Sequence, residues 1–373
     1  MFDSFHLQGV EAFKRGDYIQ AKKLFLQEIN LNHESPEAYF LLGKTCFLSA
    51  EKNEAISYLN RFFELTMKVQ NRENWSDAFD LLGQCYAANN QNEVAITYYF
   101  AAIENDFNCV SARHNLGLSY MKLAQDYLKS NFKNCFILLR DAQTALISVL
   151  ERCSDNPTFL HTAASWHELY IHLLNQSSVG KDTQEEISVH FMCAIYYYGD
   201  ALAHCPTEEC ALQKVITENL TECYVQFGHH LFQSKQYIKA QELYFLTLQL
   251  DQSHIPALNQ AGMCFFKQGM YAKARNQFAT VLEQTSDRKV QADAWLNIGC
   301  CYRLEKNWEK AEQSLLKARR LSQDDLRINE EVEKLKQAKS QGLLGVNTQT
   351  IFRIKPDNNP SLAFLNTDSF HLN

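Results

Sequence analysis

Residues 295–302 read Trp-Leu-Asn-Ile-Gly-Cys-Cys-Tyr, and the arrangement around Gly299 recurs along the chain. Ala311 follows this glycine by twelve residues, and the large apolar residue Leu315 follows it by sixteen. Seven glycines occupy this place, and all but the fourth have both partners: Gly9, Gly43, Gly83, Gly117, Gly228, Gly262 and Gly299. Three of the steps between them are 34 residues long, and a fixed spacing in this range is typical of a repeat architecture.

Each repeat reads as two amphipathic helices joined by a short polar turn. Around Gly299 the apolar residues fall three or four positions apart, which places them on one face of a helix. A glycine inside a helix costs about 1 kcal/mol relative to alanine, so its recurrence needs a packing reason. We interpret the glycine and the later alanine as the place where the two helix backbones approach closely.

This pattern resembles the tetratricopeptide repeat (TPR) family, whose signature is W-x2-L-G-x2-Y, then A-x3-F, then P. Trp295, Gly299, Tyr302, Ala311 and Leu315 reproduce most of it. The resemblance implies an all-α, right-handed α-solenoid of about eight helix-turn-helix units. The expected repeats lie near 2–34, 36–65, 75–109, 110–155, 157–206, 208–253, 255–286 and 291–323. Regular repeats are expected over 1–123 and 221–323, irregular elongated helices over 124–220, a capping helix over 324–340 and a disordered or docked tail over 341–373.

The middle of the chain departs from the pattern. Lys129 stands where the fourth repeat should have its alanine, and the signal returns displaced as Ala142 and Leu146. We expect elongated helices over 124–233 and a polar loop over 176–184. The interruption is consistent either with a place that recruits a partner or with simple drift of an insertion.

Composition and charge favour a soluble, cytoplasmic protein. The net charge is −7 with no basic stripe, so nucleic acid is not expected as a ligand. The N-terminus has no leader pattern, and the most apolar run, 135–150, is too short to insert in a membrane. In such a compartment the twelve cysteines are expected to be reduced, and several follow a repeat glycine on its helix.

No catalytic, cofactor-binding or metal-binding motif stands out, so we expect neither an enzyme nor a cofactor nor a metal. His167 and His172 are five residues apart, and two metal ligands on one helix face should be four apart. His204, Cys205 and Cys210 form a conceivable metal cluster, for which a structural or surface role is the simpler interpretation. An active centre would have to use the ionisable and aromatic residues of the irregular middle: Trp166, His167, Tyr170, His172 and His190.

In the TPR family the first helix of each repeat lines a concave groove. Carried over to this sequence, the lining is Phe13, Lys14, Phe40, Lys44, Phe47, Asp80, Gln84, His114, Met121, His229, Phe232, Asn259, Met263, Phe266 and Arg303. Phe40, Phe47, Phe232 and Phe266 are the expected anchors, since buried aromatic residues dominate interface energies. The alternative is that several of them pack between repeats instead.

The resemblance implies a non-enzymatic adaptor or scaffold that binds a peptide or helix of a partner protein in this groove. An alternative is a regulatory or substrate-recognition subunit of an enzyme complex, or a bacterial effector or chaperone that uses the same surface. Family members that bind chaperone carboxyl termini use a Lys/Asn clamp, and here His6 and Val10 occupy its first positions. That mode is therefore not expected, and the oligomeric state is left open.

Overall fold

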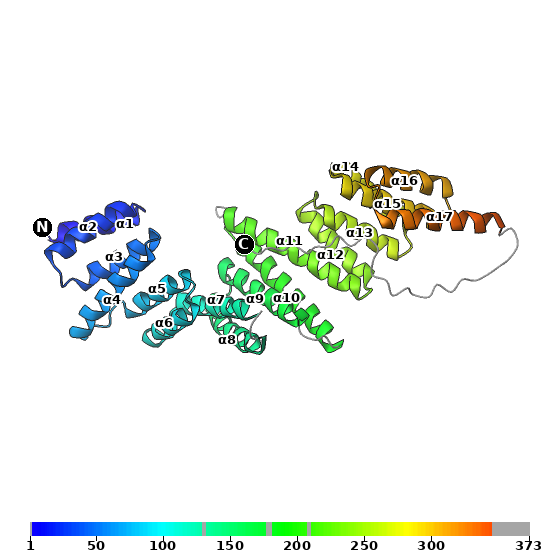
Figure 1. Ribbon diagram of the computed structural model, residues 1–373. Coiled ribbons are helices and arrows are strands. Elements are labelled where there is room, and N and C mark those ends of the chain that lie inside the picture. Colours follow the sequence, from blue (N-terminus) through cyan, green and yellow to red (C-terminus); the bar gives the residue numbers. More distant parts are fainter. Residues whose placement is uncertain (1, 129–131, 177–180, 207–209, 345–373) are drawn as a thin grey trace. The chain divides into compact units, whose positions relative to one another are not determined.

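The computed structural model describes residues 2–128, 132–176, 181–206 and 210–344 (Figure 1). Within these ranges the chain forms seventeen α-helices and no β-strand, which confirms the predicted all-α repeat solenoid. The helices before the middle of the chain are α1 (Phe2–Lys14), α2 (Tyr18–Leu31), α3 (Pro36–Leu48), α4 (Lys52–Lys68), α5 (Trp75–Ala88), α6 (Asn92–Asn105), α7 (Val110–Tyr127) and α8 (Phe132–Leu150). The remaining helices are α9 (Pro157–Gln176), α10 (Lys181–His204), α11 (Cys210–Gln233), α12 (Tyr237–Leu250), α13 (Ile255–Lys267), α14 (Tyr271–Gln284), α15 (Arg288–Leu304), α16 (Trp308–Leu321) and α17 (Leu326–Leu344).

The chain divides into two compact units, residues 1–217 and 218–373, with the boundary inside α11. In the first unit the helices pack as hairpins: α1 with α2, α3 with α4, α5 with α6, α7 with α8, and α9 with α10. The first helices of neighbouring hairpins also contact one another, from α1 with α3 through to α7 with α9. This second set of contacts makes the first helices a continuous layer of their own.

In the second unit α13 packs with α14 and α15 with α16, and α17 then contacts both helices of the last hairpin. The contact of α17 with α15 matches the contacts between first helices in the first unit. The C-terminal helix therefore occupies the place of one more first helix, as a capping helix must. The expected tail lies, from residue 345 onwards, outside the described residues.

The repeat glycines mark the closest approach within each hairpin. A methyl group added to Gly262 would lie 2.6 Å from a ring carbon of Phe278, whose side chain is fully buried. The fourth repeat obeys the same rule with a displaced partner, because a methyl group on Gly117 would lie 2.9 Å from Leu146. The prediction that Leu146 replaces the missing partner of Gly117 is thereby confirmed.

The helices of the middle are elongated, as the sequence predicts. α9 has 20 residues and α10 and α11 have 24 each, whereas α13 has 13. The polar loop expected over 176–184 is shorter than predicted, because residues 181–184 already belong to α10 and 177–180 lie outside the described residues. In the fifth repeat the Tyr198 hydroxyl donates to Glu168 at 2.7 Å and lies 3.4 Å from the Ser165 hydroxyl, which ties α10 to α9.

Each regular hairpin turns through one residue in the left-handed conformation, seven positions after the repeat glycine. Two turns place glycine there, Gly16 and Gly269, both at φ +78°. Other turns force a side chain into the same conformation, including Ala50 at φ 63° and Lys306 at φ 62°. The turn geometry is therefore set by the hairpin packing and not by the turn residue alone.

We expect the same glycine-to-alanine change to act with opposite signs at two helical sites. Gly262→Ala should lower the free energy of unfolding by about 1–3 kcal/mol, because the new methyl group overpacks the contact with Phe278. Gly199→Ala should raise it by about 0.5–1 kcal/mol, because nothing lies within 4 Å and alanine favours the helix. Urea denaturation followed by circular dichroism measures both, and changes of equal sign would contradict the packing role of Gly262.

Candidate functional site

The predicted groove residues all lie on first helices, but their side chains differ in exposure. Those of Lys14 and Lys44 are exposed. Those of Phe13, Phe47, Gln84, His229, Asn259, Phe266 and Arg303 are half-buried, and those of Phe40, Asp80, His114, Met121, Phe232 and Met263 are buried. A partner could therefore contact only part of the predicted set without rearranging the chain.

Two of the four expected anchors are core residues. Phe40 is only 7% exposed, and its ring lies 5.5 Å from that of Phe62 on α4. Phe232 is only 8% exposed. The expectation that these two rings line an open groove is wrong, because each turns into its own hairpin.

A repeated aromatic contact explains where several of these rings go. Four positions after the repeat glycine, an aromatic ring packs edge-on against a tyrosine that lies five residues further along the chain. This tyrosine is the first residue of the second helix. The pairs are Phe13 with Tyr18 at 5.7 Å, Phe232 with Tyr237 at 5.2 Å and Phe266 with Tyr271 at 5.6 Å between ring centroids. These tyrosines are not among the predicted site residues, although their recurrence nine residues after the glycine is a signal that the sequence carries.

Buried polar groups link one repeat to the next in the layer of first helices. The Asp80 carboxylate on α5 accepts hydrogen bonds from the Ser111 hydroxyl at 2.7 Å and from the Asn115 amide at 3.0 Å, both on α7, and from Gln84 at 3.1 Å. Burial raises the pKa of Asp80, against the effect of these three donors. The predicted groove residue Asp80 thus holds α5 to α7, and Gln84 supports its carboxylate from the same helix.

One group of predicted residues remains accessible on α1 and α3 of the first unit. The ammonium of Lys44 lies 5.9 Å from the centre of the Phe13 ring, and Phe47 is half-buried on the same helix as Lys44. Lys14 is exposed beside Phe13 in the sequence. No carboxylate within the described ranges pairs with either lysine. We call Phe13, Lys14, Lys44 and Phe47 the N-terminal patch.

In the second unit the predicted groove residue Arg303 pairs with a residue of α17. The Arg303 guanidinium on α15 pairs with the Glu331 carboxylate on α17, which is 3% exposed. Arg327 on α17 pairs in turn with Asp293 on α15 at 2.5 Å. Arg303, which is predicted to line the groove, is thus already paired with a segment of the same chain.

The irregular middle brings together four of its five candidate active-centre residues. The Nδ1 atoms of His167 on α9 and His190 on α10 are 2.8 Å apart, so one neutral ring donates to the other. The Tyr170 ring stacks on His190 at 4.4 Å and on Trp166 at 5.3 Å. His172 is exposed, and its ring nitrogen lies 2.8 Å from the Gln176 amide instead.

Both histidines of this cluster are held in the neutral form. Burial, helped by the neighbouring His190, lowers the pKa of His167 to about 3. Burial also lowers the pKa of His190. The packing of these rings against one another joins α9 to α10. In the regular repeats the two helices of a hairpin are joined instead at the repeat glycine, against a large side chain of the second helix.

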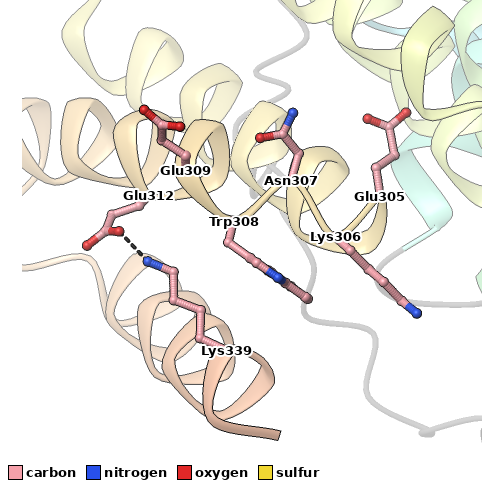
Figure 2. Close-up of a pocket in the computed structure, with 7 residues that line it drawn as sticks. All are labelled: Glu305, Lys306, Asn307, Trp308, Glu309, Glu312 and Lys339. Carbon is pink, nitrogen blue, oxygen red and sulfur yellow. Dashed lines mark hydrogen bonds and ion pairs between the residues drawn. The ribbon is translucent and has the colours of Figure 1, made fainter. Parts of the chain in front are cut away.

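An open cavity of about 700 Å³ lies between the α15–α16 turn and α17. Figure 2 shows the residues that line it. It is lined by Glu305, Lys306, Asn307, Trp308, Glu309, Glu312 and Lys339. Lys339 pairs with Glu312, and Glu305 pairs with Arg275. Figure 2 places Glu305, Asn307 and Glu309 on the opposite side of the turn from the Trp308 ring. The lining therefore presents no set of polar groups that converges on one point.

Among the described residues, one group of potential metal ligands converges: Cys46, Glu51 and Glu54. The Lys22 ammonium lies 2.5 Å from Glu51 and 3.0 Å from Glu54. Burial raises the pKa of the Cys46 thiol to about 12. A cation of the chain itself thus already occupies the space between the two carboxylates, and the thiol beside them stays protonated.

Comparisons with known proteins give one family match and several structural similarities. Residues 253–324 match the sequence family described as tetratricopeptide repeat, and no curated protein matches the chain. The chain is similar to the solved structure of the MamA protein at 17% identity, over 53% of this chain and 92% of that one, with a TM-score of 0.40. It is also similar to the TPR domain of P58(IPK) at 15% identity, over 91% and 99% of the two chains, with a TM-score of 0.31. For pilF of Pseudomonas aeruginosa the identity is 17%, the coverages are 70% and 99%, and the TM-score is 0.34.

The hydropathy of the helices adds one further observation. Within the described part of the chain, no helix combines the length and the apolar character needed to cross a bilayer.

Proposed function

We propose that this chain, whose residues 253–324 match the tetratricopeptide repeat family, is a non-enzymatic scaffold that binds a peptide or helix of a partner protein. The proposed binding surface is the layer of first helices in the first unit, at the N-terminal patch. The observation that carries the proposal is the Lys44 ammonium over the half-buried Phe13 ring, with the half-buried Phe47 on the same helix as Lys44. The exposed Lys14 follows Phe13 in the sequence, and no carboxylate of the described residues pairs with either lysine.

The chemistry of the patch indicates the kind of segment that it would bind. A half-buried ring gives apolar contact area without needing a large rearrangement, and aromatic residues contribute strongly to interface energies. An ammonium group without an internal partner favours a carboxylate from another chain. We therefore propose that the bound segment carries an apolar side chain next to an acidic one.

The test is an affinity capture with mass spectrometry that compares the wild type with two variants. A Lys14→Glu, Lys44→Glu, Phe47→Ala variant should lose its partners, with affinities at least tenfold weaker, because both charge and contact area are removed. A control, Lys23→Glu, changes an exposed lysine on α2 and should retain them. Circular dichroism must show that both variants keep their helices.

The outcome decides the proposal in either direction. Partners that are lost only from the patch variant, and whose affinity then falls at least tenfold in a binding assay with the purified proteins, would support the proposed surface. Partners that the patch variant keeps would move the binding surface away from α1 and α3, and the proposal would have to be given up.

A further inference from the structure

A second concave surface lies in the first unit on the side of the second helices. It is a groove of about 430 Å³ between α6 and α8, and α7 contributes to its lining. This volume is within the roughly 300–1,000 Å³ of typical ligand pockets. The groove is lined by Phe100, Ile103, Arg113, Leu116, Tyr120, Asp141, Thr144, Ala145 and Ser148.

Short side chains on α8 account for the space in this groove. Ala142 on α8 lies against Gly117, just as Ala55 on α4 lies against Gly43. Three residues after these alanines, α8 has Ala145 where α4 has Tyr58, and six residues after them α8 has Ser148 where α4 has Arg61. The short side chains of α8 leave open the space that long side chains occupy on α4.

Two guanidinium groups lie beside one aromatic ring at the groove. Arg113, which lines the groove, and Arg152 lie 4.4 Å and 5.4 Å from the centre of the Phe107 ring. These groups donate to backbone carbonyls, Arg113 to that of Phe107 and Arg152 to that of Ser148, and no carboxylate in the described ranges pairs with them. Asp141, in the lining contributed by α8, pairs with the neighbouring Arg140 at 3.6 Å.

The rim of the groove is apolar and open to solvent. The lining residue Phe100 is 46% exposed, and Phe107, whose ring lies against Arg113 of the lining, is 67% exposed. Exposed apolar residues that surround a groove mark an interaction site more strongly than the same residues scattered singly. The surface thus combines a cavity, an apolar rim and two guanidinium groups without acidic partners.

We propose that this groove docks a short amphipathic helical segment of a partner protein, with a carboxylate of that segment bound by Arg113 and Arg152. Apolar side chains three or four residues apart on the segment would enter the groove between α6 and α8. The C-terminal end of a helix carries partial negative charge, so the segment points this end toward the two arginines. This site is separate from the N-terminal patch, and it does not depend on the function proposed for that patch.

The experiment is a selection of random 12-residue peptides, displayed on phage, against the full-length chain. Enriched peptides should carry two apolar residues three or four positions apart, followed by an aspartate or glutamate. Their affinity for the purified chain, measured by fluorescence anisotropy, should fall at least tenfold in Arg113→Glu and in Phe100→Asp. Thr144→Arg, which adds a long side chain to the exposed wall of α8, should weaken binding to a similar extent.

Matched controls separate groove binding from a general effect of charge. Arg15→Glu and Ile19→Asp make the same kinds of change at exposed positions of the first hairpin and should leave the affinity within twofold. The proposal is overturned if no peptide of this composition is enriched, or if the enriched peptides bind the three groove variants as well as the wild type. It is also overturned if replacing the acidic residue of the peptide with lysine leaves its affinity unchanged.

Discussion

Replacing Arg303 with alanine is expected to destabilise the C-terminal end of the second unit by about 3 kcal/mol. The substitution leaves the Glu331 carboxylate, which is 3% exposed, without its main partner. The Lys334 ammonium lies 3.7 Å from the same carboxylate, but its side chain is half exposed and replaces the lost partner only in part. The expected result is a separate, early unfolding of α17 from α15 and α16.

Hydrogen exchange of α17 and urea denaturation of the full chain measure this effect. Lys336→Ala removes an exposed ion pair with Glu333 and should cost less than about 0.5 kcal/mol, since such pairs are weak. Replacing both partners, as Arg303→Met with Glu331→Leu, should restore most of the stability because no buried charge is left. If Arg303→Ala cost no more than Lys336→Ala, the ion pair would have no role in holding the cap.

Acidification from pH 8 to pH 5 is expected to destabilise the first unit by about 4 kcal/mol, because two of its histidines resist protonation. Each of these histidines contributes about 1.36 kcal/mol for every pH unit below the ordinary histidine pKa of about 6.5. Burial lowers the pKa of His114 to about 4, and burial with His190 nearby lowers that of His167 to about 3. Below pH 6.5 the unfolded chain binds a proton at each histidine and the folded chain does not. The stability is therefore complete above pH 6.5 and is lost as the pH falls toward these folded values.

A single variant isolates one histidine from every other titrating group. His114→Phe keeps the ring contact with Phe159, and the Thr162 hydroxyl can still donate to the Thr158 carbonyl. The variant should lose about 2 kcal/mol less than the wild type over the same pH range. The raised pKa of Asp80 acts in the opposite direction but equally in both proteins. Identical pH dependence of unfolding in the two proteins would contradict the assignment.

The hairpin contacts could be predicted from the sequence because each depends on a short, fixed spacing. A glycine, an alanine twelve residues later and a large residue sixteen residues later describe one contact between two adjacent helices. Even the displaced partner of Gly117 could be found, since Leu146 follows Ala142 by the usual four residues. The cap could be predicted for the same reason, from the thin apolar stripe that includes Ile328 and Leu335, which are both buried.

The exposure of individual side chains could not be predicted in the same way. Phe40 and Phe47 both lie on the first helix of the second repeat, yet Phe40 turns against Phe62 and Phe47 stays half-buried. The difference in exposure between the two rings depends on which side chains of the second helix lie opposite each of them. The ion pair of Arg303 depends on Glu331, which lies 28 residues away in the sequence. The groove beside α8 depends on the short side chains of Ala145 and Ser148. Such contacts between elements follow from the assembled structure and not from the repeat pattern.

The buried cysteines give this chain a set of reporters for local opening. Cys46, Cys85, Cys264 and Cys301 follow a repeat glycine by two or three residues in four different hairpins, and each is fully buried. Burial raises the pKa of the Cys85 thiol to about 11, so a thiol reagent reacts with it only when its hairpin opens. The alkylation rate of each cysteine, read by mass spectrometry of the unmodified wild-type chain, thus records how often that one repeat separates from its neighbours.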